Sequence, residues 1–334
     1  MNKEQTISSF ITALSKQVMD GDDEDVLRQL NGFVADHPDW IDDRFKAELT
    51  LLTDLMEERR ITDEWAYFRG IRYAYSYCLN NYGKEAPTAI QPESSLLPQK
   101  DTIWWCWLQG YEQAPDIVKA CYRSLEKLQK PVVILTDGNI SDYITLPEWI
   151  LRKYREGIID RTHYSDLVRI ELLTTLGGTW IDSTAFCTGT SLIKPLLESA
   201  DLFLFSFVMR DSVSRYLLFD NWFMHAVRKN IILEDTKNML YTYWKNENDL
   251  KHYFIFHILF SIACRKHPEE RAAIPIYSNE PCHVLQRELF NPFTENRRDQ
   301  IVGMSDIHKL TYKIDKEKEI PDGCFWAQII QNGL

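Results

Sequence analysis

Three charged residues near the middle of the chain have a spacing that could support chemistry. Asp166 and Arg169 lie three residues apart in an apolar helical pattern, so they share one face of the expected helix. Asp182 follows the short apolar run "TWI", at the point where a buried strand would end. An arginine fork binds phosphate or sugar oxygens, and a carboxylate binds hard metal ions. Each feature also has an ordinary structural explanation, because i,i+3 ion pairs are common and aspartate often begins a turn.

The residues between these groups predict how they meet. The apolar positions of the helix form one stripe, at Leu167, Ile170, Leu173 and Leu176. Gly177 and Gly178 then end the helix, since the position after a helix often needs a positive φ. The strand that follows carries Asp182 at its carboxyl end. The sequence therefore predicts a site built from one helix face and one strand end.

The surrounding elements predict an α/β fold. Apolar runs typical of buried strands alternate with amphipathic helical patterns, over 102–110, 114–130, 131–139 and 146–157. Buried strands separated by helices predict a mainly parallel sheet covered by helices. Ligands of such sheets bind outside the carboxyl ends of the strands. That rule singles out the turns at 108–112, 136–139 and 182–184.

The chain divides into three parts by composition. Residues 1–82 have helical periodicity, and residues 83–100, with three prolines and a glycine, are expected to form a linker or an extended strap. Residues 101–334 hold the α/β domain. Within it a strand is predicted at 201–208, and helices are predicted at 221–230, 234–248 and 250–267.

Bulk properties exclude several classes of protein. A net charge of −11 argues against a nucleic-acid groove, which needs a basic surface. The seven cysteines are scattered and form no CxxC pair, which predicts reduced thiols rather than disulfides or a zinc site. No secretory signal and no apolar run long enough to span a bilayer is visible. These features predict a cytoplasmic protein, and they leave open peripheral docking at the inner face of the membrane.

The segment "SDLVRIELLTTLGGTWIDST" resembles the signature of DXD-type sugar transferases, including family 32 glycosyltransferases and clostridial toxin glucosyltransferase domains. The strongest resemblance is to the bacterial capsular polysaccharide synthesis protein family. That family looks like "IWxCWxQG", "APxxVxxC" and "HFSDxxRxxLLxxYGGxWxDAT", and this chain has "IWWCWLQG", "APDIVKAC" and "HYSDLVRIELLTTLGGTWIDST". The resemblance covers roughly residues 100–265.

The resemblance implies a GT-A-like fold that binds a nucleotide-activated sugar. Asp166 and Arg169 would hold the donor sugar, with Arg169 also near the diphosphate. Asp182 corresponds to the first aspartate of the DXD motif and would touch the ribose or the sugar. These three residues are the expected catalytic set.

Further residues are expected to bind the nucleotide sugar. The resemblance places four of them near the base, the ribose or the rest of the nucleotide: Trp107, Gln109, Gly110 and Ser165. Asp137 follows the second strand and suits either a nucleotide contact or a turn. Asn221 and Trp222 suit a position beside the donor or the acceptor, although Asn221 would equally serve as a helix cap.

The resemblance also implies a divalent cation, Mn²⁺ or Mg²⁺, because the leaving diphosphate gains negative charge. The second DXD acid is replaced here by Thr184, a weaker ligand without charge. One reading keeps a metal on Asp182, Thr184 and a later residue such as His257. The other gives the metal's role to Arg169 and further basic groups. His257 stands in an apolar helical run and is also readable as a core histidine.

Together these observations predict a glycosyltransferase. It would move a hexose from a nucleotide sugar, most simply a UDP-sugar, to a capsular or other surface polysaccharide or to a lipid-linked precursor. Retention of the anomeric configuration is expected from the related families. Two alternatives stay open, a transferase with a protein acceptor and a degenerate transferase fold that only binds.

Overall fold

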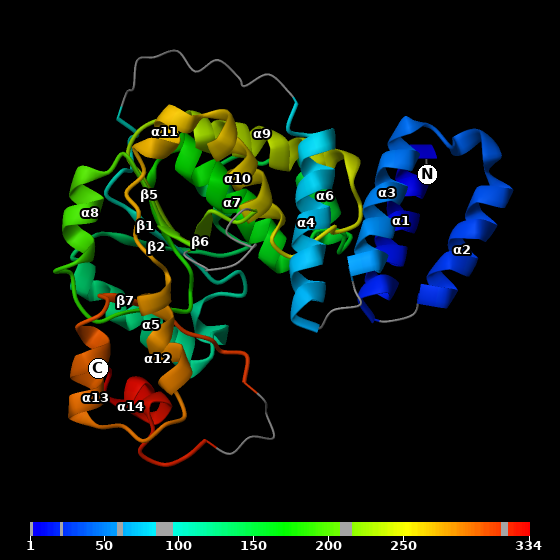
Figure 1. Ribbon diagram of the computed structural model, residues 1–334. Helices are drawn as coiled ribbons and strands as arrows, with labels where there is room; N and C mark the ends of the chain where they lie inside the picture. The colour runs from blue at the N-terminus through cyan, green and yellow to red at the C-terminus, as the bar shows by residue number, and fades with distance from the viewer. Residues whose placement is uncertain (1–2, 21–22, 59–62, 85–95, 208–215, 315–319) are drawn as a thin grey trace.

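A five-stranded sheet in the order β2-β1-β3-β6-β5 forms the centre of the larger part of the chain (Figure 1). Its strands are β1 (Ile103–Cys106), β2 (Val132–Leu135), β3 (Gly178–Ile181), β5 (Leu202–Ser206) and β6 (Phe219–Ala226). The pairs β2–β1 and β1–β3 are parallel, and β6 runs antiparallel to both of its neighbours. A separate ladder joins β4 (Ala185–Cys187) to β7 (Ile307–Lys309). The predicted fold class, a mainly parallel sheet flanked by helices, is confirmed.

The computed structural model describes the whole chain except residues 1–2, 21–22, 59–62, 85–95, 208–215 and 315–319. The α-helices are α1 (Lys3–Asp20), α2 (Asp23–Asp36), α3 (Asp43–Glu58), α4 (Asp63–Asn81), α5 (Asp116–Ser124), α6 (Glu148–Arg155), α7 (Arg161–Thr175), α8 (Ile193–Ser199), α9 (Ile231–Asn246), α10 (Ile255–Lys266), α11 (Pro268–Ala272), α12 (Glu280–Glu288), α13 (Glu295–Val302) and α14 (Phe325–Gln331). Short 3-10 helices occur at Pro38–Trp40, Tyr111–Gln113, Leu125–Leu128 and Ile140–Asp142. No helix in these described ranges is both long and apolar enough to cross a membrane.

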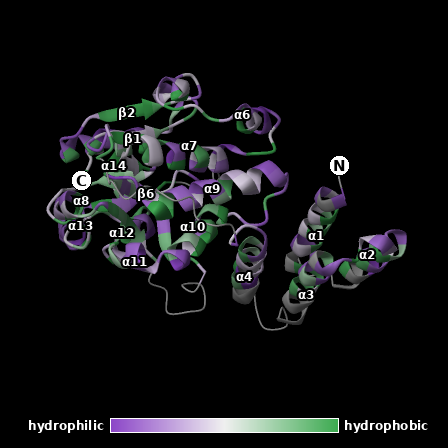
Figure 2. Ribbon diagram, turned by 90° about the horizontal axis from the view of Figure 1, so that it is seen from above, coloured by the Kyte–Doolittle hydropathy of each residue, from purple (hydrophilic) through white to green (hydrophobic). Residues whose placement is uncertain are grey.

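Both faces of the sheet are buried, which explains why its strands read as continuous apolar runs. In β1, Trp104 packs into the core that α4, α7, α9 and α10 build on one face. Its neighbours Ile103 and Trp105 pack into a second core, built with α5, α8, α12 and α14 on the other face. Strand β2 is hydrophobic along its length (Figure 2). The sheet is therefore a rigid support for whatever stands at its strand ends.

The N-terminal helices are joined to this body through α4. Helices α1, α2 and α3 lie to one side in both views (Figures 1 and 2), around a small core of their own that includes Tyr73 of α4. Further along α4, Tyr77 packs in the main core and donates a hydrogen bond to the buried Glu247 after α9. Ser8 of α1 donates to the same carboxylate at 2.6 Å. The division at 1–82, 83–100 and 101–334 stays a prediction, and α4 packs with the last of these parts.

The predicted strap at 83–100 lies partly outside the described residues. Its described end runs along the body, because the Leu97 amide donates to the Val227 carbonyl at 2.9 Å. The Gln99 amide likewise donates to the Leu176 carbonyl at 2.8 Å.

The helix predicted at 221–230 is wrong, because this segment contributes most of strand β6. All eight residues of β6 are buried between β3 and β5. The polar residues of this run do not alternate as in a half-buried strand, because Asn221 and His225 stand four residues apart, which is a helical spacing. Asn221 is accordingly a strand residue and caps no helix.

The two consecutive glycines form the predicted turn. Gly177 and Gly178 have φ values of 72° and 103°, which side-chain-bearing residues rarely adopt. A Cβ on Gly178 would lie 2.5 Å from the Thr102 carbonyl oxygen, so only glycine fits between α7 and the sheet. This close turn delivers Asp182 to the strand end next to β1.

Candidate active site

A pocket of about 410 Å³ opens at the carboxyl ends of β1 and β3, where parallel-sheet proteins commonly bind ligands. Side chains from α7, β6, α10, α12 and the segment after β7 complete its walls. Nine of the predicted site residues line it: Trp107, Gln109, Ser165, Asp166, Arg169, Asp182, Thr184, Asn221 and His257. Both motif segments therefore contribute side chains to this one pocket.

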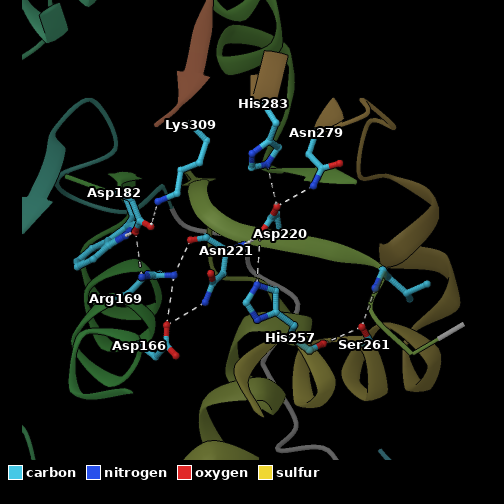
Figure 3. A network of polar contacts seen from close by, with 12 residues as sticks. Asp166, Arg169, Asp182, Asp220, Asn221, His257, Ser261, Asn279, His283 and Lys309 are labelled. Atoms are coloured by element: carbon cyan, nitrogen blue, oxygen red, sulfur yellow. Dashed lines mark hydrogen bonds and ion pairs between the residues drawn. The ribbon is translucent and has the colours of Figure 1, made fainter. Parts of the chain in front are cut away.

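Arg169 organises the floor of the pocket (Figure 3). Its guanidinium lies 3.3 Å from Asp166 and 3.2 Å from Asp182, and it donates to the Asn221 carbonyl at 2.6 Å. The Asn221 amide donates back to Asp166 at 2.9 Å. The guanidinium also stacks 4.6 Å above the Trp180 ring. These contacts fix both acids in place before any ligand arrives.

Lys309 supplies a second cation that the sequence did not predict. Its ammonium donates to Asp182 Oδ2 at 2.6 Å and to Thr184 Oγ1 at 2.8 Å. The β4–β7 ladder holds it there, since Lys309 pairs with Ala185 and the next amide, of Leu310, donates to the Thr184 carbonyl at 2.8 Å. The lysine reaches the aspartate from the opposite side to Arg169 (Figure 3).

The pKa values of Asp166 and Asp182 shift in opposite directions. Burial raises the pKa of Asp166 above its ordinary value, although Arg169 opposes the change. Burial would also raise the pKa of Asp182, but Lys309 and Arg169 outweigh it and lower that pKa. Asp182 is therefore the firmly ionised group of the pair.

A second polar cluster surrounds Asp220, whose side chain lies between His257, Asn279 and His283 (Figure 3). Its carboxylate lies 3.3 Å from His257 Nε2, accepts from Asn279 at 2.8 Å and lies 4.0 Å from His283 Nε2. Burial acts against its charge, but hydrogen bonding with the histidines lowers its pKa far below the usual range. Both histidines line the pocket, so this cluster forms the wall opposite α7.

Three predicted binding residues do not line the pocket. Gly110 stands just beyond the pocket-lining end of β1 with a φ of 90°. Asp137 accepts a hydrogen bond from the Tyr154 hydroxyl at 3.1 Å. Trp222 is buried in the core beneath β6, stacked on Phe205 with 5.0 Å between ring centroids.

The predicted metal ligands do not form a cation site as they stand. His257 points to Asp220, away from Asp182. The facing oxygens of Asp182 and Thr184 both accept from Lys309. Among the described residues, no group of three or more His, Cys, Asp and Glu side chains could hold a metal ion. Because Lys309 occupies the oxygens that would face Mn²⁺ or Mg²⁺, these side chains as arranged do not fit either ion, and the chemistry derived for this pocket involves none.

Sequence comparison identifies the family of this chain. The family model for capsular polysaccharide synthesis proteins matches residues 66–327. The chain belongs to this family. The match begins within α4, so the helix that packs in the main core is part of the unit that the family shares. Membership, with the pocket at the motif residues, makes the protein a glycosyltransferase.

Other comparisons add little. Among curated proteins, none matches this sequence significantly. One solved structure that matches is a glycosyltransferase involved in the glycosylation of the major capsid of PBCV-1, at 10% identity and a TM-score of 0.32. The match covers 64% of this chain and 93% of that one. A likeness this distant decides nothing about the donor, the acceptor or the site.

Proposed function

We propose that the pocket binds a nucleotide sugar, most simply a UDP-hexose, and transfers the hexose with retention. The proposed acceptor is a capsular or other surface polysaccharide, or its lipid-linked precursor. The observation that carries the proposal is the network in which Arg169 fixes Asp166, Asp182 and Asn221 on the pocket floor. Acids and amides fixed in this way suit sugar hydroxyls, because both hydrogen-bond several oxygens at defined angles.

The rest of the pocket supports binding of a nucleotide. Trp107 directly follows β1 and lies edge-on to Tyr312, with ring centroids 5.2 Å apart, which offers an aromatic wall for a base. Arg161, Lys309 and Lys313 also line the pocket and supply positive charge for a diphosphate. Aromatic and basic groups therefore stand in the same pocket as the fixed acids.

The state of the two acids supports the proposal of retention. Among the described residues that line the pocket, only Asp166 and Asp182 are carboxylates, and Arg169 pairs with both. Neither is free to take the acceptor's proton. We therefore propose that the acceptor hydroxyl attacks C1 on the face from which the diphosphate departs. The C1–O bond electrons pass to the leaving phosphate oxygen, which also takes the hydroxyl proton.

A donor panel tests this function. Purified protein would be screened by thermal shift with UDP-, GDP- and dTDP-sugars, each in EDTA and in MnCl₂, because a ligand of the native state raises its stability by about 2.7 kcal/mol at 100 Kd. One donor class is expected to bind. No binding in any condition would refute the assignment, and inverted product anomers by NMR would refute retention alone.

The acceptor is tested separately. Labelled donor incubated with a cell lysate is expected to appear in glycan or lipid-linked glycan. Label found only in protein would favour a protein acceptor. Donor binding with neither transfer nor donor hydrolysis above background would favour the binding module.

A further inference from the structure

We infer that the Lys309 ammonium takes the place of the divalent cation in this transferase, so that diphosphate binding proceeds without a metal. The inference rests on the proposed function. It starts from the two oxygens that the DXD pattern would turn toward a metal, on Asp182 and Thr184. Lys309 already binds both, at 2.6 Å and 2.8 Å. A divalent ion on the same oxygens would stand beside a like charge, which disfavours its binding.

The charge balance agrees with this arrangement. With threonine at 184 the motif carries one negative charge, on Asp182, and a monovalent cation is enough to neutralise it. Arg169 balances the buried Asp166 in the same network. The four groups therefore sum to zero without a metal, and Arg161 and Lys313, which also line the pocket, add the positive charge that a bound diphosphate needs. An aspartate at 184 would add a negative charge that Lys309 alone could not balance.

Lys309 can also reach a ligand. Its side chain is 20% exposed and lines the pocket. Within the described residues, two of its three N–H donors bind Asp182 and Thr184, and the third remains for a phosphate oxygen. An ammonium of this kind acts as a point charge toward phosphate.

The position of Lys309 is fixed by backbone pairing. It is the last residue of β7, and that strand is bonded to β4 directly after the motif. A cation that is held before the reaction stabilises developing charge without reorganisation. Lys309 therefore meets the two requirements for the leaving group, a positive charge and a fixed place.

The experiment measures binding of UDP, or of GDP if the donor panel selects guanine, by calorimetry in metal-stripped buffer. Wild-type affinity is expected to change less than about twofold between EDTA and MnCl₂. Lys309→Met is expected to weaken diphosphate binding about tenfold or more, and to leave uridine or guanosine binding unchanged. Lys309→Arg is expected to retain most of the affinity. Lys194→Met, at an exposed lysine paired with Glu198, is the matched control.

The outcomes separate the two proposals. Wild-type binding that collapses in EDTA and returns with Mn²⁺ would overturn the role of Lys309 and leave the transferase assignment intact. Equal losses of nucleoside and diphosphate binding in folded Lys309→Met would also overturn it. No nucleotide binding in any buffer would overturn both proposals. Because the wild-type measurement needs no substitution, the proposal stays testable even if Lys309→Met fails to fold.

Discussion

Replacing Arg169 by methionine gives the sharpest test of the pocket floor. The Arg169 side chain is 4% exposed, and its guanidinium contacts two carboxylates, on Asp166 and Asp182, and one carbonyl. Methionine fills similar space but leaves both acids without this partner. Breaking a buried ion pair from one side costs about 3–5 kcal/mol. At about 2 °C per kcal/mol for a large domain, the midpoint of thermal unfolding should fall by about 6–10 °C.

The loss of stability in Arg169→Met should depend on pH. Without Arg169 the pKa of both acids rises in the folded state, so ionised acids oppose folding above that pKa and protonated acids do not. The difference in midpoint between wild type and Arg169→Met should therefore be larger at pH 8 than at pH 4.5. Adding Asp166→Asn to the variant should recover part of the loss, because it removes one of the stranded charges.

Differential scanning fluorimetry or circular dichroism at both pH values measures these shifts. Arg169→Lys is the matched control, since it keeps the charge and loses the fork; an intermediate loss is expected. A shift below about 2 °C, or one equal at both pH values, would show that the acids are not held by this arginine.

Gly178→Ala should lower the free energy of unfolding by at least about 2 kcal/mol, because the new Cβ would clash with the Thr102 carbonyl oxygen and the residue would keep a positive φ. Gly138→Ala is the control, since a Cβ there has space around it, and the same melting assay should find it neutral. The lowered pKa of Asp220 contributes stability above its unfolded pKa, which is lost as pH falls through the folded value. The melting temperature of Asp220→Asn should therefore depend less on pH between pH 5 and pH 2 than that of the wild type, and parallel curves would contradict the assignment. Asn221→Ala should reduce kcat/KM for the donor about tenfold or more. Asp137→Ala should change kcat/KM less than about twofold, because Asp137 lies outside the pocket. A larger loss for Asp137→Ala than for Asn221→Ala would contradict this assignment of the site.

The parts of the site that the sequence predicted are those encoded by local signals. Asp166 and Arg169 lie on α7, and Asp182 directly follows β3, which a glycine turn joins to that helix, so their spacing brings them together. The turn itself is dictated by the two glycines. Local periodicity and turn chemistry were sufficient for this half of the pocket.

The other half depends on partners far apart in the chain. Lys309 belongs to a three-residue strand, too short for a periodic signal, and it meets Asp182 across 127 positions. Asp220 stands beside Asn221, but a helix prediction over 221–230 concealed that both belong to a strand that enters the site. Asn221 and His225 stand four residues apart, so the sequence pattern favoured a helix over a strand.

The β4–β7 ladder can form only after the motif residues have been synthesised, because β7 lies near the end of the chain. During synthesis the segments that carry Asp166, Arg169 and Asp182 are made well before β7, and domains begin to organise as they emerge. Until β7 pairs, Asp182 lacks the ammonium of Lys309. A chain interrupted shortly before β7 would keep Asp166, Arg169 and Asp182 but would lose the end of the region, residues 66–327, that the family model matches. It would also lack one of the two cations that hold Asp182.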